Sequence, residues 1–190
     1  MVRTFVVHVA DHPGVLNRVS SLFRRRGYNI ESLTVGHTHI PDISRMTVVV
    51  AIDAIGGPLV IANLYKLAEV LHVEDITNVP SIHRELLIAK VSAKAVTRPD
   101  LMRVLEAFGA RTLEVSAESL VLEATGAEDV IDSLIEGIEP YGILEMTRTG
   151  RVAMTRGSVP VFKHSGQKPS AVTKPFWNPA ELASLPRNSS

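Results

Sequence analysis

The 190-residue sequence predicts an α+β fold of two consecutive βαββαβ units, followed by a mostly irregular C-terminal tail. Apolar side chains recur first at every second position and then at helical spacing, in the order strand, helix, strand, strand, helix, strand. The same order then returns, with Arg84 in the place that Arg3 has in the first unit. Two such units are typical of ferredoxin-like folds, in which two helices cover one face of a four-stranded antiparallel sheet.

The first unit spans residues 1–79, and each of its elements has a local signal. Its strands alternate in polarity, its first helix carries an apolar stripe and ends at Gly27, and Gly56-Gly57-Pro58 interrupts the chain before the second helix. Alternation places Phe5, Val7 and Val9 on one face of the first strand. We expect the six elements, in chain order, at residues 4–10, 14–26, 28–38, 44–52, 60–71 and 72–79.

A short linker, residues 80–84, leads to the second unit, residues 85–157, where Gly109 ends the first helix. Its elements are expected at residues 85–93, 101–108, 111–116, 119–124, 130–138 and 141–147. The tail, residues 158–190, is rich in proline and is expected to stay largely flexible. Its Phe176-Trp177 pair is either part of a linear docking motif or part of a frayed end.

Composition narrows the class of protein. Lysine plus arginine and aspartate plus glutamate both number 20, so the net charge is zero and nucleic-acid binding is disfavoured. The absence of cysteine excludes disulfides, thiolate metal sites and cysteine nucleophiles. The N-terminus shows no signal peptide, and no apolar run approaches the roughly 20 residues of a membrane span. We therefore expect a cytoplasmic protein.

The turn between the first strand and the first helix is the strongest candidate for a binding site. A helix that begins at a Pro-Gly turn leaves its first N–H groups unpaired, and the helix dipole makes them suitable for a carboxylate. Asp11 and Asn29 can add side-chain partners for an amine, so the combination suits a free amino acid. Because exposed edge strands tend to pair, we expect a homodimer in which Asn29 reaches the turn of the partner subunit.

Other readings of the same residues are less favoured. RNA-recognition modules share the βαββαβ order, but the strand at residues 45–50 lacks the aromatic side chains on which they stack bases. The pair His37 and His39 has no further ligand at metal-site spacing, so no metal is expected. The cationic run at residues 24–26 fits the C-terminal end of a helix better than a phosphate site, and His8 is expected to be a solvated or interface side chain.

The second unit differs from the first at the corresponding turn. Residues 94–100 have a proline that could begin a helix but no glycine for close backbone approach. We infer that the first unit binds the small molecule and that the second unit has another role. No acid–base pair or activated nucleophile is recognisable in the sequence, so an independent enzyme is disfavoured.

The chain resembles the small, regulatory subunits of acetolactate synthase (acetohydroxyacid synthase), which contain an ACT domain. The resemblance covers residues 1–157, about four-fifths of the chain, and its most specific part is the run Arg26-Gly27-Tyr28-Asn29-Ile30-Glu31-Ser32. The other stretches that carry it are Pro13-Gly14-Val15-Leu16, Ser44-Arg45-Met46-Thr47, Arg84-Glu85-Leu86, Lys90-Val91 and Gly150 to Gly157.

The resemblance implies an N-terminal ACT domain and a subunit without an active site of its own. Such a subunit binds a large catalytic subunit that holds thiamine diphosphate, magnesium and FAD, raises its activity, and confers feedback inhibition by valine, leucine or isoleucine. The second unit would contact the catalytic subunit. The candidate effector-binding residues are Asp11, His12, Pro13, Gly14, Val15, Leu16, Asn29, Ile30, Thr34, Val35 and Gly36.

Two alternatives remain open. Many relatives have asparagine at the position of Asp11, and the segment 36–40 with His37 is also atypical, so the chain could be an activator that has lost feedback. It could also be a stand-alone amino-acid-binding module that controls another target.

Overall fold

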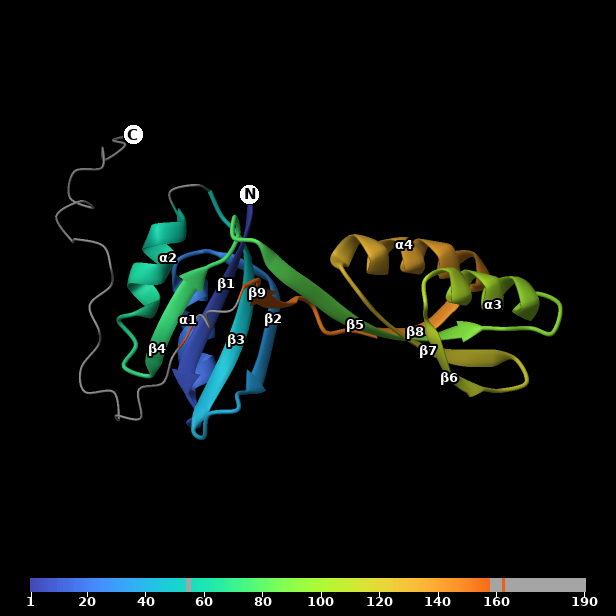
Figure 1. Cartoon of the computed structure of the whole chain (residues 1–190), viewed down its shortest axis with the longest axis horizontal. Helices are drawn as coiled ribbons and strands as arrows, with labels where there is room; N and C mark the ends of the chain where they lie inside the picture. Colours follow the sequence, from blue (N-terminus) through green and yellow to red (C-terminus); the bar gives the residue numbers. More distant parts are fainter. Residues whose placement is uncertain (54–55, 158–161, 163–190) are drawn as a thin grey trace.

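The computed structural model describes residues 1–53, 56–157 and 162, which form two units arranged along the long axis of the molecule (Figure 1). The first unit contains β1 (Val2–Ala10), α1 (Val15–Arg25), β2 (Asn29–His37), β3 (Ile43–Ala51), α2 (Gly56–Leu64) and β4 (Val70–Asp75). The second contains β5 (Ser81–Ser92), α3 (Arg98–Ala107), β6 (Arg111–Val115), β7 (Ser119–Gly126), α4 (Glu128–Ile138), a 3-10 turn (Glu139–Tyr141) and β8 (Ile143–Arg148). The predicted pair of βαββαβ units is confirmed. Except for Phe162, the predicted tail, with Phe176-Trp177, lies outside the described residues.

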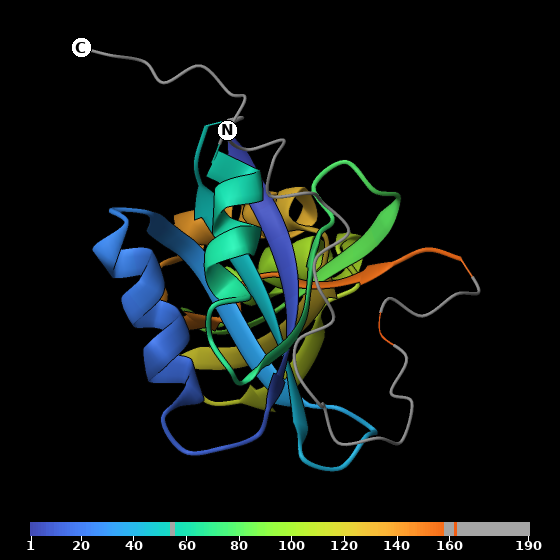
Figure 2. The same ribbon diagram turned by 90° about the vertical axis from the view of Figure 1, so that its left-hand side faces the viewer.

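The first unit is a four-stranded antiparallel sheet with strand order β2-β3-β1-β4. Figure 2 shows α1 and α2 together on one face of this sheet. Phe5, Val7 and Val9 point into the core beneath the helices, as their alternation predicts. β2 is one edge of the sheet, and the face opposite α1 and α2 (the open face) carries no helix of the described residues.

The second unit repeats this arrangement with strand order β6-β7-β5-β8. Its core lies between the sheet and the helices α3 and α4, and is separate from the core of the first unit. The two units are joined by β5, which is long enough to leave the first unit and cross the second as a central strand (Figure 1). Among the described residues, no helix is both long and apolar enough to cross a bilayer.

The predicted linker, residues 80–84, is largely a strand. Residues 81–84 form the start of β5 and pair antiparallel with β9 (Val152–Thr155), a strand that the sequence pattern did not predict. The pairing is stabilised by the first unit, because Ala153 of β9 is buried with Val6 and Ile76 on the open face of that sheet. The end of the second unit therefore packs back onto the first.

The second helix and last strand of the first unit differ from their predicted bounds. We expected a helix at residues 60–71 and a strand at 72–79, but α2 ends at Leu64 and β4 spans Val70–Asp75. The N–H of Leu67 bonds the carbonyl of Leu64 at 3.0 Å in a tight turn, and Leu71 already lies in β4. Leu64, Leu67 and Leu71 keep helical spacing in the sequence. The helix nevertheless stops at Leu64, because the chain that follows forms β4 and hydrogen-bonds to the central strand β1.

His8 was expected to be a solvated or an interface side chain, and the solvated alternative is wrong because the residue is buried. Only 7% of the residue is exposed, and its ring stacks on Phe162 with centroids 4.8 Å apart. Within the described residues, its Nδ1 atom is buried without a hydrogen-bond partner. Burial, together with the positive charge of Arg45 and the neighbouring His72, lowers the pKa of His8 to about 4.

This burial predicts a loss of stability on acidification. In the unfolded chain His8 takes up a proton near pH 6.5, whereas the folded chain resists protonation until about pH 4, so its contribution is fully present above pH 6.5 and is lost as the pH falls towards 4. The full loss corresponds to about 3 kcal/mol. Urea unfolding of the full chain between pH 7 and pH 5 should show this slope. The variant His8→Leu should reduce the slope, whereas His39→Gln, at an exposed position, should retain it.

Candidate functional site

The turn between β1 and α1 leaves the start of the helix open. Gly14 is the N-cap residue, with a left-handed φ of 88°, and no side chain of the described residues caps the helix. The N–H of Asp11 is bonded to the carbonyl of Asp42 at 2.9 Å, which ties the turn to the loop between β2 and β3. The residues from Asp11 to Gly14 are exposed. The N–H of Val15 is bonded to the carbonyl of His12 at 3.3 Å, so the N–H groups that follow it, at the positive end of the helix dipole, are the ones that favour an anion.

The carboxylate of Asp11 lies 3.0 Å from Nδ1 of His37, the last residue of β2. The structure thus joins the two residues at which the sequence departs from the family pattern. The side chain of Asp11 is 41% exposed and that of His37 is 84% exposed, so this is a solvent-accessible pair at the mouth of the turn. An imidazolium in this position would partly neutralise Asp11, while one carboxylate oxygen remains accessible to an amine.

The predicted site residues on β2 lie at two ends of the strand. Asn29 pairs with Ala51 of β3, which itself pairs with Val2 at the start of β1. At the other end of β2, His37 pairs with Ser44 of β3, near the end of β1. Gly36 is therefore close to the Asp11 turn. Asn29 is about 26 Å away along the strand, at about 3.3 Å per residue. In this chain its amide donates a 2.8 Å hydrogen bond to Glu31, so a single subunit does not bring Asn29 to the turn.

The remaining predicted residues divide between the edge of the sheet, its core and its open face. Leu16 and Val35 are 45% and 46% exposed, and they offer apolar surface on α1 and β2. Val15 is buried, and Ile30 packs against the same core. The Thr34 hydroxyl donates a 3.0 Å hydrogen bond to the carbonyl of Arg151, so this side chain contacts the second unit and not the turn.

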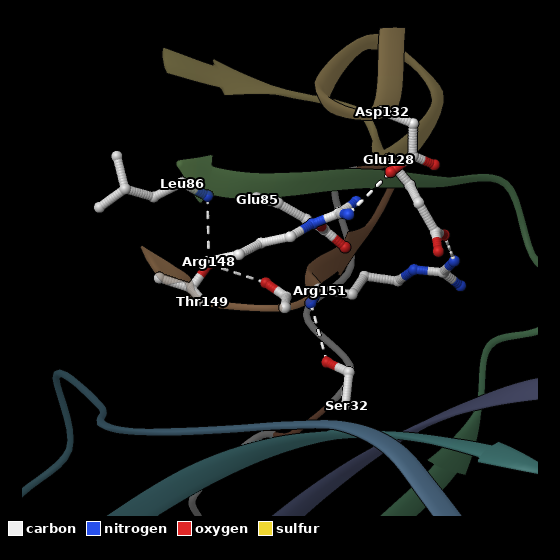
Figure 3. Close-up of polar contacts among 9 residues, drawn as sticks. Ser32, Glu85, Leu86, Glu128, Asp132, Arg148, Thr149 and Arg151 are labelled. Atoms are coloured by element: carbon white, nitrogen blue, oxygen red, sulfur yellow. Dashed lines mark hydrogen bonds and ion pairs between the residues drawn. The ribbon is translucent and has the colours of Figure 1, made fainter. Parts of the chain in front are cut away.

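A polar junction links the two units at the same strand (Figure 3). The Oγ atom of Ser32 accepts a 2.9 Å hydrogen bond from the N–H of Arg151. The guanidinium group of Arg151 bonds the hydroxyl of Thr4 at 2.9 Å and forms an ion pair with Glu128 at the start of α4. A cavity of about 470 Å³ lies between the units here, lined by Val2, Glu31, Ser32, Leu33, Val49, Glu85, Glu128 and residues 148–151.

Arg148 forms the second-unit side of this junction. Its guanidinium pairs with Glu85, which is 5% exposed, and with Asp132 of α4 at 2.7 Å. Burial alone would lower the pKa of Arg148, but the hydrogen bonds to the two carboxylates raise it overall. The Oγ1 atom of Thr149 accepts a 3.1 Å hydrogen bond from the N–H of Leu86, which fixes the turn that leads to Arg151.

Sequence reasoning missed the junction residues. The stretch that begins at Gly150 was recognisable as part of a family pattern, but no local spacing relates it to Ser32. The contact between Asp11 and His37 could have been predicted. In a sheet with the order β2-β3-β1, the end of β1 and the end of β2 lie at the same end of the sheet.

The corresponding turn of the second unit is closed by its own side chain. The guanidinium of Arg98, the first residue of α3, donates hydrogen bonds to the carbonyls of Ala93, Ser116 and Ala117 at 2.7 to 2.8 Å. A cation therefore occupies the space beside the helix start that stays open in the first unit. This difference agrees with the prediction that the two units have different roles.

Comparisons with known proteins give the same two-part division. Residues 5–72 match the family described as AHAS small subunit-like ACT domain, and residues 84–157 match the family described as small subunit of acetolactate synthase. A probable acetolactate synthase small subunit of Archaeoglobus fulgidus is 46% identical over 158 residues, covering 83% of this chain and 99% of the relative. The acetolactate synthase small subunit of Mycolicibacterium smegmatis is 44% identical over 154 residues, covering 81% and 91%.

A solved structure extends the likeness to three dimensions. The crystal structure of the acetolactate synthase small subunit from Thermotoga maritima superposes with a TM-score of 0.79 at 32% identity. The match covers 84% of this chain and 99% of that one.

Proposed function

This chain belongs to the family of acetolactate synthase small subunits, and from that premise we propose that it regulates a catalytic acetolactate synthase subunit. In this proposal it is non-catalytic, raises the activity of the catalytic subunit and confers feedback inhibition by valine or a related branched-chain amino acid. Thiamine diphosphate, magnesium and FAD would belong to the catalytic partner.

The open start of α1 is the observation that carries this proposal. A free amino acid presents a carboxylate and an ammonium group on one carbon. The N–H groups after Val15 suit the carboxylate, and the partly exposed carboxylate of Asp11 suits the ammonium group. Leu16 and Val35 supply apolar surface for a small aliphatic side chain. A feedback effector with a Kd between roughly 1 μM and 1 mM requires about −8 to −4 kcal/mol, which such a set of contacts can provide.

Pairing of two copies would complete the site. β2 is an unpaired edge of its sheet within the described residues, and an antiparallel pairing of two β2 strands about Leu33 would put Asn29 of one copy opposite His37 of the other. Asn29 would then lie beside the Asp11 turn of the second copy. The separation of the predicted residues to two ends of one strand supports a homodimer with the effector at its interface.

The second unit is proposed to hold the catalytic subunit. Its equivalent turn is closed by Arg98, so it is not a second copy of the effector site. Its edges carry exposed apolar side chains, which favour contact with another protein. These side chains are Met102 on α3, Leu113 and Val115 on β6, and Leu144 and Met146 on β8.

Reconstitution with the catalytic subunit of the same organism tests the proposal. The wild-type chain should raise acetolactate formation, and valine should lower it again. Asn29→Ala should raise the valine concentration for half-inhibition at least about tenfold, because a hydrogen bond to a charged group contributes about 1.5–3 kcal/mol. Activation without valine should be unchanged. Asn78→Ala, at an exposed position between β4 and β5, is the matched control.

A chain that neither binds nor activates the catalytic subunit would refute the proposal. The carboxylate of Asp11 favours one alternative, an activator without feedback, because a negative charge beside the helix start can repel an acidic ligand. In that case activation would be normal, and calorimetry of the isolated chain with valine, leucine and isoleucine would show no binding.

A further inference from the structure

The strand that carries the candidate effector residues also holds the second unit. Ser32 and Thr34 are two residues apart on β2, so both point to the open face of the sheet. There both contact Arg151. Ser32 accepts the N–H of Arg151 at 2.9 Å, and Thr34 donates to the carbonyl of Arg151 at 3.0 Å. The N–H and the carbonyl of Arg151 are therefore both bonded to β2, so a displacement of β2 also displaces Arg151.

Close approach at Gly150 allows this contact. Gly150 has a φ of 76°, which L side chains rarely adopt, and a Cβ atom added to it would lie only 3.0 Å from the Cβ atom of Ser32. The turn therefore lies directly against Ser32 of β2, with no space for a side chain at position 150.

The side chain of Arg151 extends the link to a helix of the second unit. Its guanidinium pairs with Glu128 in the first turn of α4 (Figure 3). It also bonds the hydroxyl of Thr4 of β1. The side chain of Arg151 is 20% exposed and that of Glu128 is 51% exposed, so the ion pair is shielded from solvent only on its Arg151 side. Next to it, Arg148 pairs with Asp132 one helical turn further along α4. Residues 148–151 thus hold the position of α4 relative to β2.

We propose that Arg151 is a positioning residue that transmits effector occupancy at the β2 edge to α4 and so to the catalytic subunit. This inference rests on the proposed function. Effector binding and β2 pairing act on the strand that fixes Arg151, and the second unit is the part proposed to contact the catalytic subunit. The effector can inhibit only if it binds one arrangement of the junction better than the other, and a tenfold preference corresponds to about 1.4 kcal/mol.

The test separates effector binding from inhibition. Arg151→Met removes the contacts to Glu128 and Thr4 but leaves the main-chain hydrogen bonds to β2. Calorimetry of the isolated variant should give a valine Kd within about threefold of wild type, and the reconstituted enzyme should be activated normally. Valine inhibition should be lost or should need at least ten times more valine. Glu128→Gln should show the same pattern more weakly, and Arg151→Lys should restore part of the inhibition.

Arg103→Met is the matched control, because Arg103 pairs with Asp100 within α3 and does not bridge the units. Circular dichroism checks that each variant folds, and Glu128→Gln provides the test if Arg151→Met does not fold. Unchanged inhibition in both junction variants would overturn the inference, as would loss of valine binding by the isolated variants, which would place these residues in the effector site itself. A wild-type chain that binds none of the three amino acids would overturn the proposed feedback and this inference together.

Discussion

Arg148→Met is expected to destabilise the second unit by about 3–5 kcal/mol, the range seen when one partner of a buried ion pair is removed. Glu85 lies at the point where β5 enters the second unit, and only 5% of its side chain is exposed. Without the guanidinium group, its carboxylate would stay buried without its charge partner. Asp132 of α4 would also lose its 2.7 Å ion pair, so the contact between α4 and the junction should weaken.

Urea unfolding followed by circular dichroism measures this effect. Arg111→Met is the matched control, because Arg111 pairs with Glu123 at 3.2 Å while its own side chain is 74% exposed. An exposed pair contributes at most about 1 kcal/mol. The double variant Glu85→Leu, Arg148→Met should recover most of the lost stability, since it leaves no buried charge. A loss below 1 kcal/mol in the single variant would show that Glu85 finds another partner or reaches solvent.

Local sequence signals predicted most of the fold. The alternation of Phe5, Val7 and Val9 identified β1 and its buried face, and Gly27 and Gly109 marked the ends of α1 and α3. These signals depend on neighbours within one turn or one strand, so they can be interpreted without knowing the tertiary structure. The same reasoning placed the start of α1 at the Pro13-Gly14 turn, because the strand, the turn and the helix are consecutive.

Contacts between distant segments could not be predicted in the same way. β9 is a strand because it pairs with residues 81–84 and because Ala153 is buried against Val6 and Ile76. His8 alternates as an exposed residue would, and it is buried because Phe162 covers it. The contact of Gly150 with Ser32 belongs to the same class. Each of these contacts depends on which segment of the chain crosses the open face of the first sheet. The apolar periodicity of the strands in that sheet does not determine this segment.

Gly14→Leu is expected to weaken valine binding by the isolated chain at least about 100-fold. A leucine at a φ of 88° costs about 1–2 kcal/mol of backbone strain, and relief of that strain would rotate the peptide N–H groups away from the ligand. Hydrogen bonds to a charged group contribute about 1.5–3 kcal/mol each, so the loss of two of them accounts for the expected change. Apart from its chain neighbours, no atom of the described residues lies within 4 Å of the added Cβ, so the fold should tolerate the substitution.

Gly109→Leu is the control that separates backbone strain from ligand contact. Gly109 follows α3 in the second unit, has a φ of 65°, and also has no atom within 4 Å of an added Cβ. The two variants therefore carry a similar conformational cost at positions of similar openness. Calorimetric titration with valine should show normal affinity for Gly109→Leu and little or no binding for Gly14→Leu. If Gly14→Leu binds valine as tightly as wild type, the carboxylate does not sit at the start of α1, because no leucine at that position could leave such a site intact.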